Sequence, residues 1–145
     1  MPHCWPQFGP GAIQTHGFAR NVDWTLVGTQ DGDEPSMTME LTPSEYSKAM
    51  WDKEFKVTET VTLKANGALE ATLVVENNGK EAFDFTGSFH TYLAADINAA
   101  AVGGLNGCKT FDRLAEKEST VAGDVKFQGP IDSVYYGVPE TLTLA

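Results

Sequence analysis

The chain has 145 residues, of which 41% are hydrophobic and 21% are charged, a composition typical of a folded domain and not of a disordered segment. A chain of this size buries roughly 70% of the surface that its unfolded form exposes, which is enough for one hydrophobic core. The net charge of −10 leaves no basic stripe for a nucleic-acid backbone or an anionic membrane surface, so we expect neither partner.

The apolar stretches are short. The longest, at 73–75 and 99–102, fall far below the ~20 residues that cross a bilayer. The first residues form neither a secretory signal nor a transit peptide, so we expect a cytoplasmic protein, with a plastid left open for a longer parent chain.

Cysteine and histidine are sparse. In such a compartment we expect Cys4 and Cys108 to be free thiols. His3, Cys4 and His16 match no four-ligand spacing, so we expect no metal site.

The N-terminal segment 2–17 is rich in proline and glycine, which indicates an ordered loop instead of a helix or a strand. Trp5 and Phe8 within it need an apolar wall to pack on.

Strand patterns follow from residue 22 onward. Five strands are predicted at 22–29, 36–41, 54–65, 68–77 and 83–94, and four shorter ones near 109–114, 121–127, 133–136 and 141–144. Turn sequences separate the early strands and indicate hairpins: Asp31-Gly32-Asp33, Asn66-Gly67 and Asn77-Asn78-Gly79. The fold class is therefore all-β, a large antiparallel sandwich or barrel.

One short helix is expected near 43–51. Thr42 offers an N-cap hydroxyl, Pro43 suits the first helical position, and Glu45 supplies the carboxylate of a capping box.

The predicted strand 83–94 has two different faces. One is apolar and is expected in the core: Phe83, Phe85, Phe89 and Leu93. The other is polar: Asp84, Thr86, Ser88, His90 and Tyr92. This polar row is either a solvated surface or the floor of a binding cleft, and the sequence leaves both open. His90 stands out because imidazole exchanges protons near neutral pH.

Three other side chains are candidates for a site. His16 and Arg20 lie in the N-terminal loop, where they either bind a ligand or satisfy a loop carbonyl and an acidic neighbour. Asp132 precedes a strand and either binds a ligand or caps a turn. The chain contains no nucleophile elbow, phosphate-binding glycine loop or dinucleotide fingerprint.

Several motifs in collinear order carry a family resemblance. They are the runs Pro2-His3-Cys4-Trp5-Pro6-Gln7-Phe8-Gly9-Pro10, His16-Gly17-Phe18-Ala19-Arg20-Asn21, Trp51-Asp52, Ser88-Phe89-His90-Thr91-Tyr92, Gly104-Leu105-Asn106-Gly107-Cys108-Lys109 and Ile131-Asp132-Ser133-Val134-Tyr135. Together they resemble the hexose-6-phosphate mutarotases, or glucose-6-phosphate 1-epimerases, of the aldose 1-epimerase superfamily. The plant and algal branch similar to apospory-associated protein C is the most similar one.

The resemblance implies an antiparallel supersandwich of the galactose mutarotase type whose concave face binds a sugar phosphate and interconverts its α and β anomers. It implies no cofactor and no metal. His90 would be the general acid at the ring oxygen, and His16 would orient the sugar or support the acid. Arg20 would bind the substrate and could contact its phosphate, and Asp132 would accept hydrogen bonds from sugar hydroxyls.

Departures from the family pattern limit these implications. Thr15 stands where the family often has glutamine, so Gln14 could replace that contact. Family chains are about twice as long, with an Arg-Gly-Gly segment upstream and a catalytic glutamate downstream. We therefore expect residues 1–145 to be the central part of a single incomplete β-sandwich domain that is inactive by itself. The alternatives are a non-catalytic carbohydrate-binding or regulatory module and an inert fragment.

Overall fold

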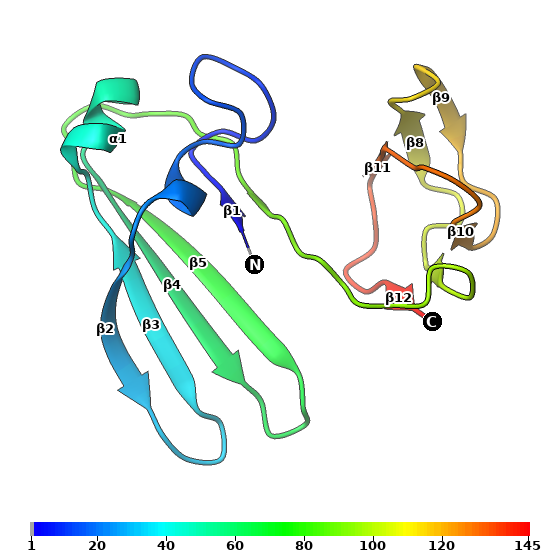
Figure 1. Cartoon of the computed structure of the whole chain (residues 1–145), viewed down its shortest axis with the longest axis horizontal. Helices are drawn as coiled ribbons and strands as arrows, with labels where there is room; N and C mark the ends of the chain where they lie inside the picture. The colour runs from blue at the N-terminus through cyan, green and yellow to red at the C-terminus, as the bar shows by residue number, and fades with distance from the viewer. Residues whose placement is uncertain (1) are drawn as a thin grey trace. The chain divides into compact units, whose positions relative to one another are not determined.

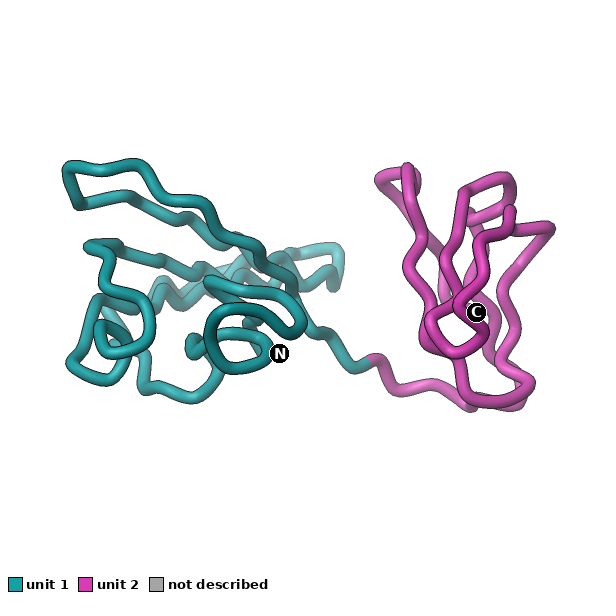
Figure 2. The backbone as a smooth tube through the Cα atoms, turned by 90° about the horizontal axis from the view of Figure 1, so that it is seen from above, with its two compact units in different colours: residues 1–92 teal, residues 93–145 magenta. Residues whose placement is uncertain are grey.

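The structure is a computed structural model that describes residues 2–145. It is nearly all-β, with antiparallel strands and one short α-helix (Figure 1), which confirms the predicted fold class. The chain divides into two compact units, Met1–Tyr92 and Leu93–Ala145, which Figure 2 colours separately. That both belong to a single sandwich domain stays a prediction. Within residues 2–145 there is no helix long and apolar enough to span a membrane.

Unit 1 is built around a four-stranded antiparallel sheet in the order β2-β3-β4-β5 (Figure 1). Its elements are β1 (His3–Cys4), the 3-10 helix η1 (Ala19–Asn21), β2 (Thr25–Gln30), β3 (Ser36–Leu41), α1 (Glu45–Met50), β4 (Phe55–Leu63), β5 (Leu69–Asn77) and β6 (Ser88–Phe89). The hairpins predicted at Asp31-Gly32-Asp33 and Asn66-Gly67 are confirmed, because β2 pairs with β3 and β4 pairs with β5. Gly67 adopts φ +84°, the left-handed conformation that glycine tolerates in a tight turn.

The two faces of this sheet differ in polarity. On one face Leu41, Phe55 and Val57 are at most 5% exposed and belong to the hydrophobic core. On the other, Lys56 forms an ion pair with Glu76 at 2.7 Å, and partly exposed polar side chains surround it. A strand with period-two alternation has this arrangement when only one of its faces is covered.

The N-terminal segment supplies the cover. Trp5 is 1% exposed, and its ring centroid lies 4.7 Å from that of Phe55 and 5.3 Å from that of Trp51. Phe18, fully buried, lies 5.8 Å from Trp5 in an edge-to-face contact. The wall expected for Trp5 is therefore the sheet itself, whereas Phe8 is 51% exposed.

The prediction of a long strand at 83–94 is wrong. Only β6 is in a sheet, and it pairs with β1 through His3↔Phe89 and Cys4↔Ser88, so the hairpin predicted at Asn77-Asn78-Gly79 does not form. The segment 2–17 is accordingly not all loop. Alternation shows which side chains share a face, but it does not identify the partner strand.

The expected core face of this segment is also largely wrong. Phe83 packs partly buried against the core, but Phe85, Phe89 and Leu93 are 47%, 41% and 70% exposed. Phe85 and Phe89 are covered on one side only, by the rings of Trp5 and His3 at 6.0 and 5.7 Å.

The helix begins two residues later than predicted. The N-cap is Ser44, whose Oγ accepts the Ser47 N–H at 3.2 Å, while Ser47 Oγ accepts the Ser44 N–H at 2.8 Å. Thr42 is therefore not the cap, and Pro43 precedes the helix. Two serines three residues apart complete the capping box without a carboxylate.

Unit 2 consists of short strands. They are β7 (Ala101–Gly103), β8 (Lys109–Asp112), β9 (Lys117–Thr120), β10 (Val125–Lys126), β11 (Ser133–Tyr136) and β12 (Thr143–Leu144). They form two antiparallel sheets, β10-β7-β12 and β11-β8-β9. Three of the four strands predicted here are confirmed with small shifts, and the one at 121–127 shortens to β10. Two strands were not predicted, because neither shows hydrophobic alternation: β7, which has small side chains, and β9, which is polar and exposed throughout.

Candidate functional site

A strained turn in the N-terminal loop holds His16. His16 and Gly17 both adopt φ +68°, a conformation that is unfavourable for residues with a Cβ. The His16 N–H donates to the Gly9 carbonyl at 3.0 Å, and the Gly17 N–H donates to Gln14 at 2.9 Å. A Cβ on Gly17 would lie 2.2 Å from the Trp5 carbonyl oxygen. Only glycine fits after His16, and the turn is thereby fixed against the buried Trp5.

Two glutamines brace this loop. Gln7 donates to the carbonyls of Gly9 and Ile13 at 3.0 and 3.2 Å. The Gln14 amide donates to the Gly17 carbonyl at 2.7 Å, and its oxygen accepts the Tyr46 hydroxyl at 3.1 Å. Because both ends of the Gln14 amide are already bonded, it is poorly placed to replace the ligand contact expected next to His16.

The imidazole of His16 has a defined tautomer. Its Nδ1 accepts the backbone N–H of Gly9 at 3.1 Å, so the neutral ring carries its proton on Nε2. The partner is an amide donor and not the loop carbonyl considered in the sequence analysis. The ring of Phe8 lies 5.5 Å away, centroid to centroid. His16 can therefore present an N–H donor to a ligand.

His90 follows β6 and lies beside His16. The two ring centroids are 5.7 Å apart, nearly edge to face, and Tyr92 stacks on His90 at 4.9 Å. The His90 backbone N–H donates to the Pro2 carbonyl at 2.9 Å. Its ring is half-buried, and within residues 2–145 neither ring nitrogen has a hydrogen-bond partner. The structure thus brings together two of the residues selected from the sequence.

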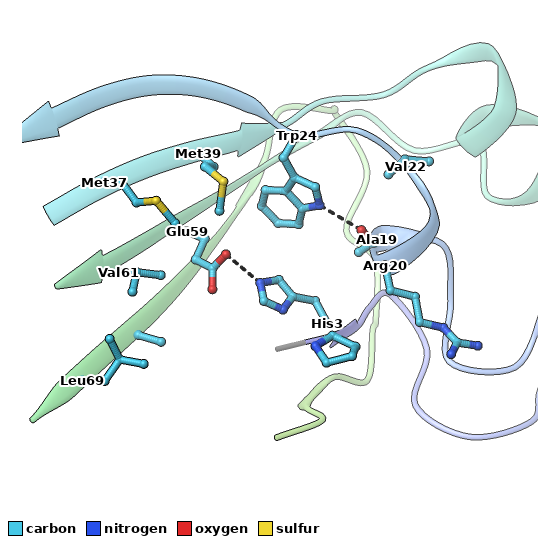
Figure 3. A pocket seen from close by; sticks show the side chains of 12 residues that line it. His3, Ala19, Arg20, Val22, Trp24, Met37, Met39, Glu59, Val61 and Leu69 are labelled. Atoms are coloured by element: carbon cyan, nitrogen blue, oxygen red, sulfur yellow. Dashed lines mark hydrogen bonds and ion pairs between the residues drawn. The ribbon is translucent and has the colours of Figure 1, made fainter. Parts of the chain in front are cut away.

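Arg20 belongs to η1 and is exposed. Its Nη2 donates to the Thr15 carbonyl at 3.0 Å, which holds the guanidinium beside the loop that carries His16. In the described part of the chain, Arg20 has no carboxylate partner at ion-pair distance. The alternative that Arg20 only satisfies an acidic neighbour is therefore wrong. Arg20 also lines a cavity of about 500 Å³, which neither His16 nor His90 lines (Figure 3). In Figure 3 its guanidinium points away from the methionines of that cavity.

Asp132 belongs to unit 2 and precedes β11. One carboxylate oxygen lies 3.6 Å from Nη1 of Arg113, and the Asp132 carbonyl accepts the Arg113 N–H at 2.8 Å. The turn-capping carboxylate in this region is that of Asp112, which accepts the N–H groups of Leu114 and Ala115. The Asp132 side chain itself is about half exposed.

A buried contact between His3 and Glu59 was not predicted from the sequence. Nε2 of His3 lies 2.7 Å from a carboxylate oxygen of Glu59, and the two side chains are 10% and 5% exposed (Figure 3). The available signal was the position of Glu59 on β4, where it shares the face of Phe55, Val57 and Val61. A carboxylate among apolar neighbours on that face predicts a buried partner.

The cysteines lie in different units. Cys4 is buried on β1 and Cys108 is half-buried in unit 2, and both are free thiols. Burial raises the pKa of the Cys4 thiol, and the charge of Arg20 partly opposes that rise.

Comparison with known proteins identifies the family. Residues 1–138 match the aldose 1-epimerase family. The chain belongs to this family. The resemblance of its motifs to glucose-6-phosphate 1-epimerases is confirmed by an Escherichia coli (strain K12) protein named "Putative glucose-6-phosphate 1-epimerase". That protein is 36% identical over 142 residues, which are 93% of this chain and 46% of the relative. The chain thus spans about half the length of the curated relatives that it matches.

Solved structures of similar proteins agree with this assignment. A Salmonella typhimurium protein described as "a putative mutarotase (YeaD)" superposes with a TM-score of 0.87 at 29% identity, covering 99% of this chain and 48% of that one. The Slr1438 protein from Synechocystis sp. PCC 6803 superposes with a TM-score of 0.83 at 18% identity, covering 96% and 52%. The second similarity shows the fold alone, and the fold is that of a mutarotase-like antiparallel β-protein.

Proposed function

We propose that this polypeptide is the central part of an epimerase that interconverts the α and β anomers of a hexose 6-phosphate. Family membership supports the reaction class. The name of the E. coli relative supports the phosphorylated substrate. The observation that carries the proposal is the pair of imidazoles, His16 and His90, held 5.7 Å apart by separate backbone contacts.

Anomerisation requires two proton transfers. A base removes the proton of the C1 hydroxyl, the bond between C1 and the ring oxygen breaks as the C1 carbonyl forms, and an acid protonates the ring oxygen. Rotation about the bond between C1 and C2, followed by the reverse steps, gives the other anomer. No electrons are gained or lost, so the reaction needs no redox cofactor.

The two imidazoles have different roles in this scheme. His90 has ring nitrogens without protein partners in the described part of the chain, and it acts as the general acid at the ring oxygen. His16 carries its proton on Nε2 and donates to a sugar oxygen, which orients the ring.

Arg20 and Asp132 bind the substrate. Arg20 uses one of its five donors on the Thr15 carbonyl, which leaves the others for the phosphate oxygens. Asp132 accepts hydrogen bonds from sugar hydroxyls. Its exposed contact with Arg113, at 3.6 Å, is a weak competitor.

The general base of this reaction is a glutamate outside residues 1–145. Without it, this chain should bind a sugar phosphate but not turn it over. The test compares this chain with a version extended at both ends, in a coupled assay that follows anomer conversion of glucose 6-phosphate. We expect the extended protein to convert the anomers and this chain not to convert them. An extended protein that binds the sugar phosphate without converting it would favour a non-catalytic carbohydrate-binding module instead.

Variants of the extended protein test the assigned roles. His90→Asn should lower kcat by about 100-fold or more with a smaller change in KM, because an amide cannot donate a proton to the ring oxygen. An unchanged kcat would remove His90 from the reaction. Arg20→Ala should weaken binding of glucose 6-phosphate by about 10-fold or more but leave the binding of unphosphorylated glucose nearly unchanged. Equal losses for both ligands would make Arg20 structural.

A further inference from the structure

The pair of His3 and Glu59 is an anomaly in the core of unit 1. Glu59 is 3% exposed and lies on the apolar face of β4. Burying an imidazole and a carboxyl group costs free energy in desolvation even when they are hydrogen-bonded to each other, and apolar side chains of similar size often serve stability equally well. Stability alone therefore does not explain these two residues.

His3 connects the sheet to the short strand pair β1-β6. Its Nε2 bonds to Glu59 on β4, whereas its backbone is paired with Phe89 on β6. Its ring also contacts Trp24 and Phe89 edge to face, at 5.3 and 5.7 Å. Its Nδ1 is buried and has no partner among the described residues, so the bond from Nε2 is the polar anchor of this ring.

The same strand pair carries His90. Phe89 immediately precedes His90, and the His90 N–H donates to the carbonyl of Pro2, the neighbour of His3. β1 and β6 contribute only two residues each, and two further backbone bonds flank the pair, from the Thr86 N–H to the Pro6 carbonyl and from the His90 N–H to the Pro2 carbonyl. The Trp5 carbonyl, directly after β1, accepts the N–H groups of Phe18 and Ala19, so β1 also joins the turn that holds His16, and the bond from His3 to Glu59 joins β1 to β4.

We propose that the ion pair between His3 and Glu59 positions His90 by locking β1 to β4. The inference rests on the proposed function only in so far as His90 is the catalytic acid. A directional bond at 2.7 Å between buried partners can specify one register where apolar packing permits several. His3 and Glu59 are thus positioning residues, because they act through Phe89 and Pro2.

Amide hydrogen exchange on this chain tests the positioning without any assay of turnover. The double variant His3→Leu/Glu59→Leu should retain the unfolding midpoint of the wild type, because the core stays filled. The His90 amide should nevertheless lose about 10-fold or more of its protection, because the β1 register is no longer fixed. The matched control is Glu76→Leu, which removes the partner of Lys56 from the polar face of the same sheet. It should leave His90 protection unchanged.

Conservative variants cover the case in which the double variant does not fold. Glu59→Gln keeps an oxygen that accepts the His3 Nε2–H and should retain His90 protection. Glu59→Met fills similar space without an acceptor, and it should lower the protection of the His90 amide by about 10-fold. Equal protection in Gln and Met variants, or full protection in a folded double variant, would overturn the proposal.

Kinetics of the extended protein separate this inference from the proposed function. His3→Leu/Glu59→Leu should lower kcat by about 10-fold with little change in KM, whereas the single variant Glu59→Gln should keep kcat near that of the wild type. A wild-type extended protein without turnover would refute the proposed function, but the exchange experiment would still decide whether the ion pair positions His90. A kcat that is the same in the double variant and the wild type would overturn the inference alone.

Discussion

Unit 1 and unit 2 are both built from antiparallel strands, but they bury their apolar side chains to different extents. In unit 1, Trp5, Phe18 and Phe55 are at most 1% exposed. In unit 2 the buried hydrophobic residues described are Ala100 and Leu105, at 6% and 3%. Other apolar side chains of unit 2 are 38–45% exposed, among them Ile131, Val134, Val138, Leu142 and Leu144.

Strand length and cover explain the difference. β4 and β5 have nine residues each and present a face that is apolar except at Glu59, and the rings of Trp5 and Phe18 cover part of it. The strands of unit 2 have two to four residues and carry no comparable cover of their own. Backbone pairing alone does not produce a core, so most of the stability within this chain should reside in unit 1. The three tryptophans, Trp5, Trp24 and Trp51, all belong to unit 1, and their fluorescence reports on it selectively.

The largest expected difference is in stability: replacing a phenylalanine by alanine should destabilise unit 1 more than unit 2. Phe55→Ala removes a ring that is 1% exposed and contacts Trp5, and it should lower the free energy of unfolding by about 3–5 kcal/mol. Phe111→Ala removes a half-buried ring from β8 and should cost clearly less. Denaturant titration followed by fluorescence measures the first, and hydrogen exchange in β8 measures the second. Equal losses would contradict the difference in burial.

The glycine after His16 should be the next most sensitive position. Gly17→Ala places a Cβ 2.2 Å from the Trp5 carbonyl oxygen in a left-handed conformation, so it should destabilise unit 1 by about 2 kcal/mol or more. Gly28→Ala is the matched control, because a Cβ there meets nothing within 4 Å. The unfolding midpoint from tryptophan fluorescence compares them. A stable Gly17→Ala variant would show that the turn can relax away from Trp5.

The helix cap should have a smaller effect. Ser44→Ala removes the hydroxyl that accepts the Ser47 N–H and should cost about 1 kcal/mol. Thr42→Ala, two residues earlier, should change stability by less than about 0.5 kcal/mol, because Thr42 is exposed and is not the cap. Urea titrations of the two variants check the order. A larger loss at Thr42 would restore the helix start expected from the sequence.

The smallest expected effect is a pH dependence confined to unit 1. Burial raises the pKa of the Cys4 thiol above that of the unfolded chain, so the folded state holds this proton more tightly. The resulting stability is complete below about pH 8.5 and declines as the pH rises further. Cys4→Ala should flatten that decline, whereas Cys108→Ala should not alter it. Fluorescence-monitored unfolding between pH 7 and 10 measures both slopes, and identical slopes in all three proteins would contradict the assignment.

Part of the fold could be predicted because its causes are local. The hairpin turn at Asn66-Gly67 and the alternation along β3, β4 and β5 depend on residues close in sequence, and they placed these strands correctly. The family motifs likewise selected His16 and His90, which lie side by side in the structure. The sequence predicted the helix but placed its N-cap at Thr42 instead of Ser44, since both hydroxyls lie near the helix start.

The sequence by itself determined an all-β chain, its main hairpins and the family to which it belongs. Only the tertiary structure decided that β6 pairs with β1 instead of β5, that Trp5 fills the core, and that His3 meets Glu59. The pairing of β1 with β6 and the contact of His3 with Glu59 join residues more than 50 positions apart. Their partners are selected by which surfaces and charges remain unsatisfied after the local elements form, and no pattern within one segment contains that information.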